Sequence, residues 1–445
     1  MSRWAVVGGG MLGMELARQL ERDGHTVTLF ERASQLGGLA ASWELSGFRW
    51  DRHYHVVTPT DERTEALLGE LELELRWVTT RTGVYGEGAH HSVSNAGEFL
   101  RFPLLSPLDK VRLAATLLYA SRITDGEKLS EIPVEDWLVR LSGRRVTDRF
   151  WMPLLRAKLG DLARQTSAAF IWTVIRRLYA ARTSGRRTEQ LGYVPGGYGA
   201  ILDAMGADLL GRGIDVRLDA PIDRVRADEG AIVVEVGPDR ERFDEVVVTA
   251  PAPIARRLVA GLEQSEAERL DQVRYMGVVC ASVVLSRPLT EFYVTNLIDE
   301  TPFTGVIEMT ALIDPDEIDG HHLVYLPRYV AADDPLLDAP VEEIRQIFLD
   351  GLRELHPDLR DDEIVGFAVS RPRYVLPVPV IGYAARVPAM RTSVSGVWTV
   401  NSAQITDGTL NVDETLRLAD RAMAEIRSTS GRTPTGLSAA GEAAS

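Results

Sequence analysis

Six residues near the N-terminus have the types and spacing that bind phosphate. They are Gly8, Gly9, Gly10, Met11, Leu12 and Gly13, which form the pattern G-x-G-x-x-G. The pattern follows a short apolar run and precedes leucines spaced by four, so it lies where a buried strand turns into a helix. In such a turn the first glycine permits the bend, the second lets a pyrophosphate reach the backbone, and the third lets helix and strand pack closely. We predict that a dinucleotide binds to the amides at the start of this helix.

An acidic residue follows the second predicted strand. Residues 25–30 are rich in β-branched side chains and end at Glu31. A carboxylate at this point can accept hydrogen bonds from the ribose of an adenosine, and it disfavours the 2′-phosphate of NADP. The alternative is a glycine-rich turn without a ligand, but the order of strand, glycines, helix, strand and acid favours dinucleotide binding.

A second glycine pair separates the candidate dinucleotides. Gly37 and Gly38 follow Glu31 by six residues, and Leu39 comes next. A simple NAD domain has no evident need of this pair. FAD is longer, and its pyrophosphate and ribityl chain could use another close approach to the backbone here. The spacing therefore favours FAD, and a nicotinamide dehydrogenase is the lesser alternative.

Two histidines lie close together in residues 51–55, which read Asp-Arg-His-Tyr-His. On an extended chain His53 and His55 point to the same face. Imidazole titrates near neutrality, so these side chains could act in catalysis or position a substrate. A metal site would need further ligands that the sequence does not offer nearby, and structural hydrogen bonding around a cofactor is a third possibility. We predict that both histidines are catalytic and that no metal is bound.

Two Arg-Tyr pairs and one glutamate are candidates for substrate binding. Arg328 and Tyr329 form one pair, Arg373 and Tyr374 the other, and both follow predicted strands. Arginine can hold a carboxylate or phosphate at two points, and tyrosine can stack on a ring. Glu308, within another strand, could bind an amine or a hydroxyl. The alternative for each pair is a place on the surface or between domains.

Composition excludes several classes of protein. The 445 residues are 45% hydrophobic and 25% charged, with a formal charge of −15 and one cysteine, Cys280. This is neither a disordered chain nor a disulfide-stapled module. Nucleic acid and anionic membranes are disfavoured partners because binding to phosphate is mainly electrostatic. We find no signal-peptide pattern and no run of about 18 apolar residues, and we expect a cytoplasmic location. A small molecule is the expected partner, with peripheral membrane contact only if the substrate is a lipid.

Short blocks along the chain resemble the flavin-containing amine oxidase superfamily. This group includes amine oxidases, protoporphyrinogen oxidases, phytoene-type desaturases and, more distantly, UDP-galactopyranose mutases. The first block joins Glu31 to the glycine pair and to the Gly-Phe-Arg-Trp-Asp sequence at 47–51. The others lie at residues 193–199, 213–218, 222–225, 243–251, 396–402 and 410–415.

The resemblance implies FAD and a set of residues that hold it. Beyond the residues of the two glycine motifs and Glu31, these are Arg32, Leu39, Val225, Asn401, Leu410, Asn411 and Val412. Many members have Gly-Glu or Gly-Asp where this chain has Val400 and Asn401. Members with covalent flavin carry a cysteine in the C-terminal part, where this chain has none, so non-covalent FAD is expected. Some members also place a lysine near the flavin N5, which makes Lys158 a catalytic candidate, although a lysine that extends from a helix surface is the alternative.

The expected fold is of the α/β class. The resemblance implies a Rossmann-like FAD-binding domain with a doubly wound parallel sheet, built from residues 1–75, 190–275 and 376–428. A mixed α+β substrate domain would be inserted as residues 76–189 and 276–375, and 429–445 would form a disordered tail.

The expected activity is that of an FAD-dependent oxidoreductase. A hydride would pass from a substrate C–H to the flavin N5 and leave a C=C or C=N bond. Two alternatives remain on the same scaffold. One is a redox-neutral isomerase or mutase, and the other is a binding protein without catalysis.

Overall fold

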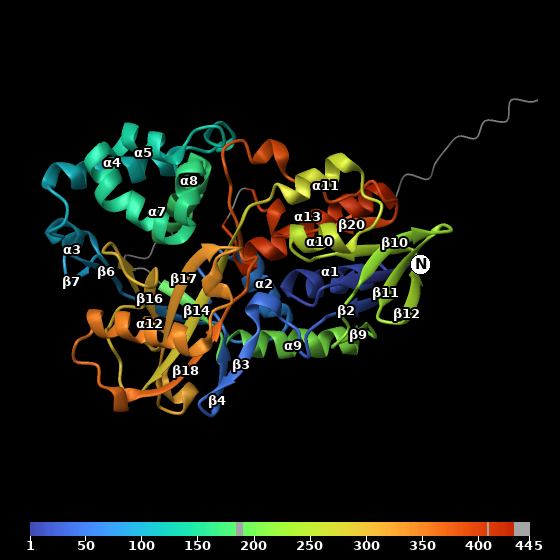
Figure 1. The fold of residues 1–445 in the computed structure, drawn as a ribbon, viewed down its shortest axis with the longest axis horizontal. Coiled ribbons are helices and arrows are strands. Elements are labelled where there is room, and N and C mark those ends of the chain that lie inside the picture. Colours follow the sequence, from blue (N-terminus) through green and yellow to red (C-terminus); the bar gives the residue numbers. More distant parts are fainter. Residues whose placement is uncertain (184–189, 407–408, 431–445) are drawn as a thin grey trace, which may run out of the picture.

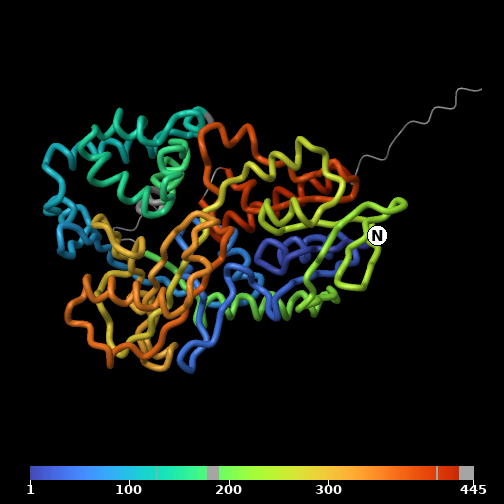
Figure 2. Tube along the Cα trace, in the orientation of Figure 1, coloured from blue at the N-terminus to red at the C-terminus, as the bar shows by residue number. Residues whose placement is uncertain are grey.

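The computed structural model describes residues 1–183, 190–406 and 409–430. A parallel sheet with its helices occupies one end of the molecule, and a helical cluster and a second sheet occupy the other end (Figure 1). The chain passes between the two ends several times, so segments far apart in sequence lie side by side in the trace of Figure 2.

The parallel sheet gathers strands from three parts of the sequence. Its order is β20-β13-β1-β2-β9, and every neighbouring pair is parallel. The strands are β1 (Arg3–Val7), β2 (Thr26–Phe30), β9 (Asp215–Arg217), β13 (Glu245–Val248) and β20 (Val397–Thr399). This arrangement confirms the predicted α/β class with a Rossmann-like parallel sheet.

Alternating side chains of the strands fill two cores. On β1, Trp4 and Val6 pack against helices, whereas Ala5 and Val7 pack against a small antiparallel sheet on the opposite face. The helices are α1 (Met11–Arg22), α2 (Glu62–Glu70), α9 (Gly197–Gly211) and α13 (Val412–Ser430). The antiparallel sheet consists of β10 (Arg224–Asp228), β11 (Ala231–Val236) and β12 (Asp239–Phe243).

A second, larger sheet lies at the other end. Its order is β18-β14-β17-β16-β15-β6-β7, and β19 pairs with β14. The strands are β6 (Thr82–Gly86), β7 (Ala89–Ser92), β14 (Tyr275–Leu285), β15 (Val294–Leu297), β16 (Gly305–Glu308), β17 (His322–Ala331), β18 (Ile364–Ser370) and β19 (Leu376–Pro377). Helix α12 (Val341–Leu355) covers one face of this sheet. Because β6 and β7 precede the other strands by about 180 residues, the two predicted insertions share one sheet.

Residues 96–183 form a helical insertion with its own core. It contains α3 (Ala96–Arg101), α4 (Pro107–Arg122), α5 (Val134–Ser142), α6 (Arg144–Val146), α7 (Met152–Leu159) and α8 (Ala168–Thr183). Trp137, Trp151 and Trp172 lie in that core, which also contacts Met276 and Leu376 of the larger sheet.

Shorter elements connect these units. They are β3 (Ser42–Leu45), β4 (Phe48–Asp51), β5 (Arg76–Thr79), β8 (Gln190–Tyr193), α10 (Ala252–Leu258) and α11 (Gln264–Asp271). Strands β3 and β4 pair as a hairpin, and β5 pairs with β8.

The C-terminal boundary differs from the expected one. Helix α13 continues to Ser430, so the predicted tail cannot begin at 429, and residues 431–445 lie outside the described part of the chain. The apolar stripe of α13, from Leu416 to Ile426, packs in the same core as α1. Among the described residues, no helix has the length and apolarity needed to cross a membrane.

Candidate functional site

The glycines of the first motif meet different surroundings. A Cβ atom at Gly13 would lie 1.8 Å from the carbonyl oxygen of Gly8, and one at Gly8 would lie 2.4 Å from Thr249 Oγ1. These two glycines are therefore required by the packing of the protein itself. A Cβ at Gly10 would meet nothing closer than 4.0 Å, where it approaches Gly37 and Gly38. The space beside Gly10 is open, as a site for a ligand against the backbone must be.

Helix α1 begins beside this space without a cap. No side chain accepts a hydrogen bond from its first turn, and that turn contains no acidic residue. The first amides of a helix lack intrahelical partners and carry a partial positive charge. Met11 and Leu12, at this end, therefore offer backbone donors to an anionic group such as a pyrophosphate.

The carboxylate of Glu31 is held at the end of β2. It accepts hydrogen bonds from the amide nitrogens of Gly9 at 2.6 Å and Ala33 at 2.9 Å. A carboxylate has about four acceptor positions, so two remain for ribose hydroxyls. The amide of Gly37 donates to the carbonyl oxygen of Gly9 at 2.8 Å, which fixes the second glycine pair against the first. The backbone of the two motifs thus forms one cradle.

His53 lies next to this cradle. Its Nδ1 is 2.9 Å from the carbonyl oxygen of Leu39, directly after the second glycine pair. Burial lowers the pKa of His53 to about 4, so the ring is neutral at pH 7. The carbonyl can only accept, so Nδ1 carries the proton and Nε2 presents a lone pair. This buried Nε2 has no hydrogen-bond partner among the described residues.

His55 has a different environment, although its ring lies 6.4 Å from that of His53 in an edge-to-face arrangement. Its Nδ1 is 3.6 Å from Asp51 Oδ2, and its ring lies 4.6 Å from that of Tyr198. Asp51 accepts a hydrogen bond from the amide of Tyr198 at 2.9 Å, and burial raises the pKa of this carboxyl. In the described part of the chain, three or more His, Cys, Asp or Glu side chains nowhere gather as metal ligands would. The catalytic roles of His53 and His55 stay predictions.

The neutral state of His53 predicts a pH dependence of stability. Below pH 6.5 the unfolded chain takes up a proton that folded His53 resists, so stability falls as the pH is lowered. Between pH 6.5 and 5 the loss is about 1.6 kcal/mol. Urea unfolding at the two pH values measures it, and His53→Gln should remove this share. His356, whose pKa burial also lowers to about 4, contributes equally in both proteins, so their difference isolates His53. An unchanged slope in His53→Gln would refute the assignment.

Lys158 and Tyr329 were predicted for different roles, and the structure places their side chains in contact. Lys158 on α7 places Nζ 5.7 Å from the ring centroid of Tyr329 on β17. The hydroxyl of Tyr329 lies 3.0 Å from the hydroxyl of Tyr54. In the sequence, Tyr54 stands between His53 and His55. Tyr54 was not among the residues predicted from the sequence. On an extended segment its side chain points to the face opposite to that of His53 and His55, and this alternation was the available signal that it contacts a different part of the protein. The proposed role of Lys158 stays a prediction, and this contact gives it a defined neighbour.

The two tyrosine hydroxyls should be energetically coupled. Tyr329→Phe leaves the largely buried Tyr54 hydroxyl without its partner, so we expect a loss of about 1 kcal/mol in the free energy of unfolding. The double variant with Tyr54→Phe should lose less than the sum of the single variants, because no hydroxyl is then left unpaired. Urea titration of all four proteins measures the coupling, and strict additivity would show that the hydroxyls do not interact.

The other predicted substrate residues make contacts within the protein. Arg328 donates to the carbonyl of Pro302 at 3.1 Å, and Arg373 forms an ion pair with Asp338. The ring of Tyr374 packs 5.6 Å from that of Tyr275. These contacts do not bring the two Arg-Tyr pairs together.

Glu308 is 1% exposed, and its carboxylate accepts hydrogen bonds from the amides of Leu289 at 2.9 Å and Thr290 at 2.7 Å. Burial raises its pKa to about 7. Its contacts fix the loop after β14. Binding of substrate by Glu308, Arg328, Arg373 and Tyr374 therefore gains no support from their geometry.

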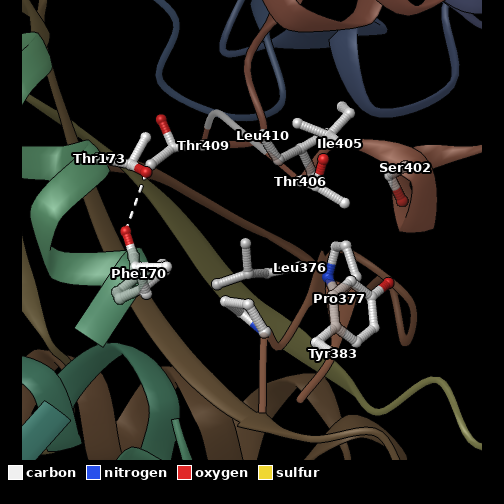
Figure 3. A pocket seen from close by; sticks show the side chains of 12 residues that line it. Phe170, Thr173, Leu376, Pro377, Tyr383, Ser402, Ile405, Thr406, Thr409 and Leu410 are labelled. Atoms are coloured by element: carbon white, nitrogen blue, oxygen red, sulfur yellow. Dashed lines mark hydrogen bonds between the residues drawn. The ribbon is translucent and has the colours of Figure 1, made fainter. Parts of the chain in front are cut away.

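A pocket lies beside the segment that carries the C-terminal cofactor candidates, and Leu410 is the candidate that lines it. The pocket lies between α8, β19 and the segment that leads into α13, and its empty space together with the open solvent at its mouth is about 440 Å³ (Figure 3). Its side chains include Phe170, Thr173, Leu376, Tyr383, Ser402 and Leu410, which the close view shows around a common hollow. Of these, only Leu410 was predicted, because the pocket combines residues of a helix, a strand and connecting segments that carry no recognisable motif.

Two asparagines shape the backbone on either side of this pocket. Asn401 is 1% exposed, and its Oδ1 accepts from the amide of Ala403, while its buried Nδ2 has no partner among the described residues. Asn411 Oδ1 accepts from the amide of Glu414 at 2.8 Å in the first turn of α13. The free amide group of Asn401 is a donor available to a ligand.

Three other predicted cofactor residues have less distinctive places. Arg32 is exposed after β2, Leu39 is partly buried beside His53, and Val225 is buried where β10 pairs with β11. Their contacts to a cofactor stay predictions.

Comparison with known proteins agrees with this geometry. The profile of the family described as "Flavin containing amine oxidoreductase" matches residues 13–389. The chain is 27% identical to coproporphyrinogen III oxidase of Mycobacterium tuberculosis over 285 residues, which are 58% of this chain and 61% of that protein. It thus spans about three fifths of the length of this relative. It is 26% identical to a 4,4′-diapophytoene desaturase of Staphylococcus haemolyticus, over 68% of this chain and 67% of that one.

Among solved structures, the fold is similar to that of putrescine oxidase bound to putrescine. The TM-score is 0.75 at 18% identity, and the match covers 96% of this chain and 99% of the other. The blocks of sequence, the parallel sheet and the family profile lead to the same conclusion. The chain belongs to the flavin-containing amine oxidoreductase family.

Proposed function

We propose that this protein binds FAD without a covalent bond and uses it to oxidise a small organic substrate at a C–H bond. Membership of the family implies a flavin. The observation that carries the choice of FAD is the cradle at Gly10, which is open on its ligand side, ends at an uncapped helix and has Glu31 fixed at its edge. An adenosine diphosphate moiety, which FAD has and FMN lacks, requires these groups.

The available donors and acceptors fit such a cofactor. The amides at the start of α1 would hold the pyrophosphate, and Glu31 would hold the ribose. The unpartnered Nδ2 of Asn401 is a donor and the unpartnered Nε2 of His53 is an acceptor for the remaining polar groups. Both are buried polar atoms whose lack of a partner would otherwise destabilise the fold.

The single cysteine of the chain, Cys280, is poorly placed to form a covalent bond with the flavin. Cys280 lies within β14, is 0% exposed, and burial raises the pKa of its thiol. A buried, protonated thiol is a poor nucleophile.

The chemistry supplied by a bound flavin is acceptance of a hydride from the substrate, which leaves a C=C or C=N bond once a proton is also lost. The part of this chain is to bind and orient the substrate and to exclude water. The pocket has the character for this, because Phe170, Leu376 and Leu410 are apolar whereas Thr173 and Ser402 can orient a polar group.

Anaerobic mixing tests the proposed oxidation. The protein is mixed without oxygen with the molecules that its relatives' names suggest, namely coproporphyrinogen III, 4,4′-diapophytoene and putrescine. A substrate that is oxidised should bleach the visible absorbance of the flavin in a single turnover. Product formation without net bleaching, and only after prior chemical reduction of the flavin, would instead show redox-neutral catalysis. Binding of a ligand without either change would contradict an enzymatic role toward that ligand.

A further inference from the structure

Exposed apolar side chains concentrate at one place on the molecule. Half of the large apolar residues that are exposed in the described chain lie on α3 and α4. We call them the apolar outer face, and they are Leu100, Leu108, Val111, Leu118 and Tyr119. The other exposed apolar residues occur singly at scattered positions, which is ordinary for a soluble protein. A contiguous group indicates a surface that binds something.

Helix α4 is apolar on two opposite sides. Leu113, Thr116 and Ala120 are buried in the core of the helical insertion. Leu108, Val111 and Leu118 recur at helical spacing on the other side, together with Tyr119, and that side faces away from the rest of the molecule. Lys110 Nζ donates to the carbonyl of Leu100 at 2.6 Å, which fixes α3 beside this face. In Figure 1, α4 lies at the outer edge of the helical insertion.

Positive charge surrounds the apolar outer face. Arg101, Arg112 and Arg122 are exposed next to it, and the exposed positions of α4 include no acidic residue. The helical insertion as a whole, residues 96–183, contains 15 lysines and arginines against 9 acidic residues, a formal charge of +6 in a chain whose total is −15. The helical insertion is therefore basic although the chain as a whole is acidic.

We propose that the apolar outer face binds the surface of an anionic lipid membrane. The apolar side chains would enter the boundary between headgroups and acyl chains, and the three arginines would contact lipid phosphates. The exposed face of one helix suits a flat partner better than a peptide that needs a groove. A symmetric contact between two copies would bring the same arginines together, which like-charge repulsion opposes.

The binding would be peripheral, with α4 parallel to the membrane. The core of α4 contacts α8, whose residues Phe170 and Thr173 line the pocket described above. A membrane-bound α4 would therefore lie one helix away from the proposed substrate site. The proposal itself does not depend on the flavin chemistry, and its test needs no substrate.

Vesicle flotation tests the proposal with the purified protein. We expect the protein to float with phosphatidylcholine–phosphatidylglycerol vesicles and to remain behind with pure phosphatidylcholine. The double variant Leu108→Glu, Val111→Glu should lose flotation, whereas Leu210→Glu, at a leucine that is 65% exposed on α9, should float like the wild type. Each arginine is worth about fivefold in partitioning, so Arg101→Gln, Arg112→Gln, Arg122→Gln together should reduce it by more than about tenfold.

A fluorescent label tests the orientation directly. Because Cys280 is the only cysteine and is fully buried, Leu108→Cys and Leu210→Cys each create a single reactive site. A polarity-sensitive dye should shift to shorter wavelength on anionic vesicles at position 108 and not at 210.

Three results would overturn the proposal. They are equal flotation of Leu108→Glu, Val111→Glu and the wild type, an equal shift at both dye positions, and failure of the wild type to float. Sedimentation that shows a dimer broken by the same double variant would assign the face to a second copy of the chain instead.

Discussion

Replacing Gly10 with valine is expected to abolish flavin binding and to leave the fold intact. The backbone of Gly10 has φ −75° and ψ 175°, which valine adopts without strain, and its Cβ would meet no protein atom closer than 4.0 Å. The added side chain would fill the open side of the cradle, where the pyrophosphate must approach the backbone. We expect affinity for FAD to fall by at least about 100-fold, equivalent to about 2.7 kcal/mol.

Flavin titration of the cofactor-free protein and thermal melting of the same sample separate the two effects. Gly69→Val is the matched control, because Gly69 lies in α2 with nothing within 4 Å of an added Cβ. This control should bind FAD like the wild type. Unchanged affinity in Gly10→Val would show that no ligand uses the cradle.

Replacing Gly13 with alanine should have the opposite effect and destabilise the protein itself. The new Cβ would lie 1.8 Å from the carbonyl oxygen of Gly8 and 3.0 Å from its carbonyl carbon. Both neighbours are backbone atoms, so α1 would have to move away from β1. We expect a loss of at least about 3 kcal/mol in the free energy of unfolding, at the upper end of overpacking effects.

Urea unfolding of the cofactor-free protein measures this loss. If the loss exceeds the stability of the wild type, the variant will not accumulate as folded protein. Gly211→Ala is a control at the end of α9, where an added Cβ meets nothing within 4 Å, and its midpoint should not fall. A Gly13→Ala protein with an unchanged midpoint and lost FAD binding would mean that this glycine serves the ligand and not the packing.

The strand–glycine turn–helix–strand unit at the N-terminus could be predicted from the sequence because its determinants are local. Gly8, Gly10, Gly13 and Glu31 lie within one strand–helix–strand unit, so spacing along the chain sets their spacing in space. The individual strands of the parallel sheet are short apolar runs that the sequence shows. Their order could be predicted only from the family resemblance, because the strands come from three distant parts of the chain.

The pocket and the contacts among Tyr54, Tyr329 and Lys158 could not be predicted because they depend on distant segments of the chain. Tyr54 and Tyr329 are 275 positions apart, and Lys158 comes from a third segment. Glu308 differs, because an acid in a strand suggested ligand binding and its carboxylate accepts hydrogen bonds from Leu289 and Thr290, so its predicted role stays a prediction. Overall charge also averages a basic helical insertion with acidic surroundings, so the total of −15 does not describe that insertion.

The most direct measurement of the central claim is identification of the cofactor released from purified protein. The protein is denatured, the precipitate is removed, and the supernatant is analysed by absorbance and mass spectrometry. We predict FAD in the supernatant in an amount equimolar with the chain, and none attached to the precipitated polypeptide. A colourless protein that also fails to bind added FAD, or a flavin that stays with the polypeptide, would contradict the proposed non-covalent FAD site.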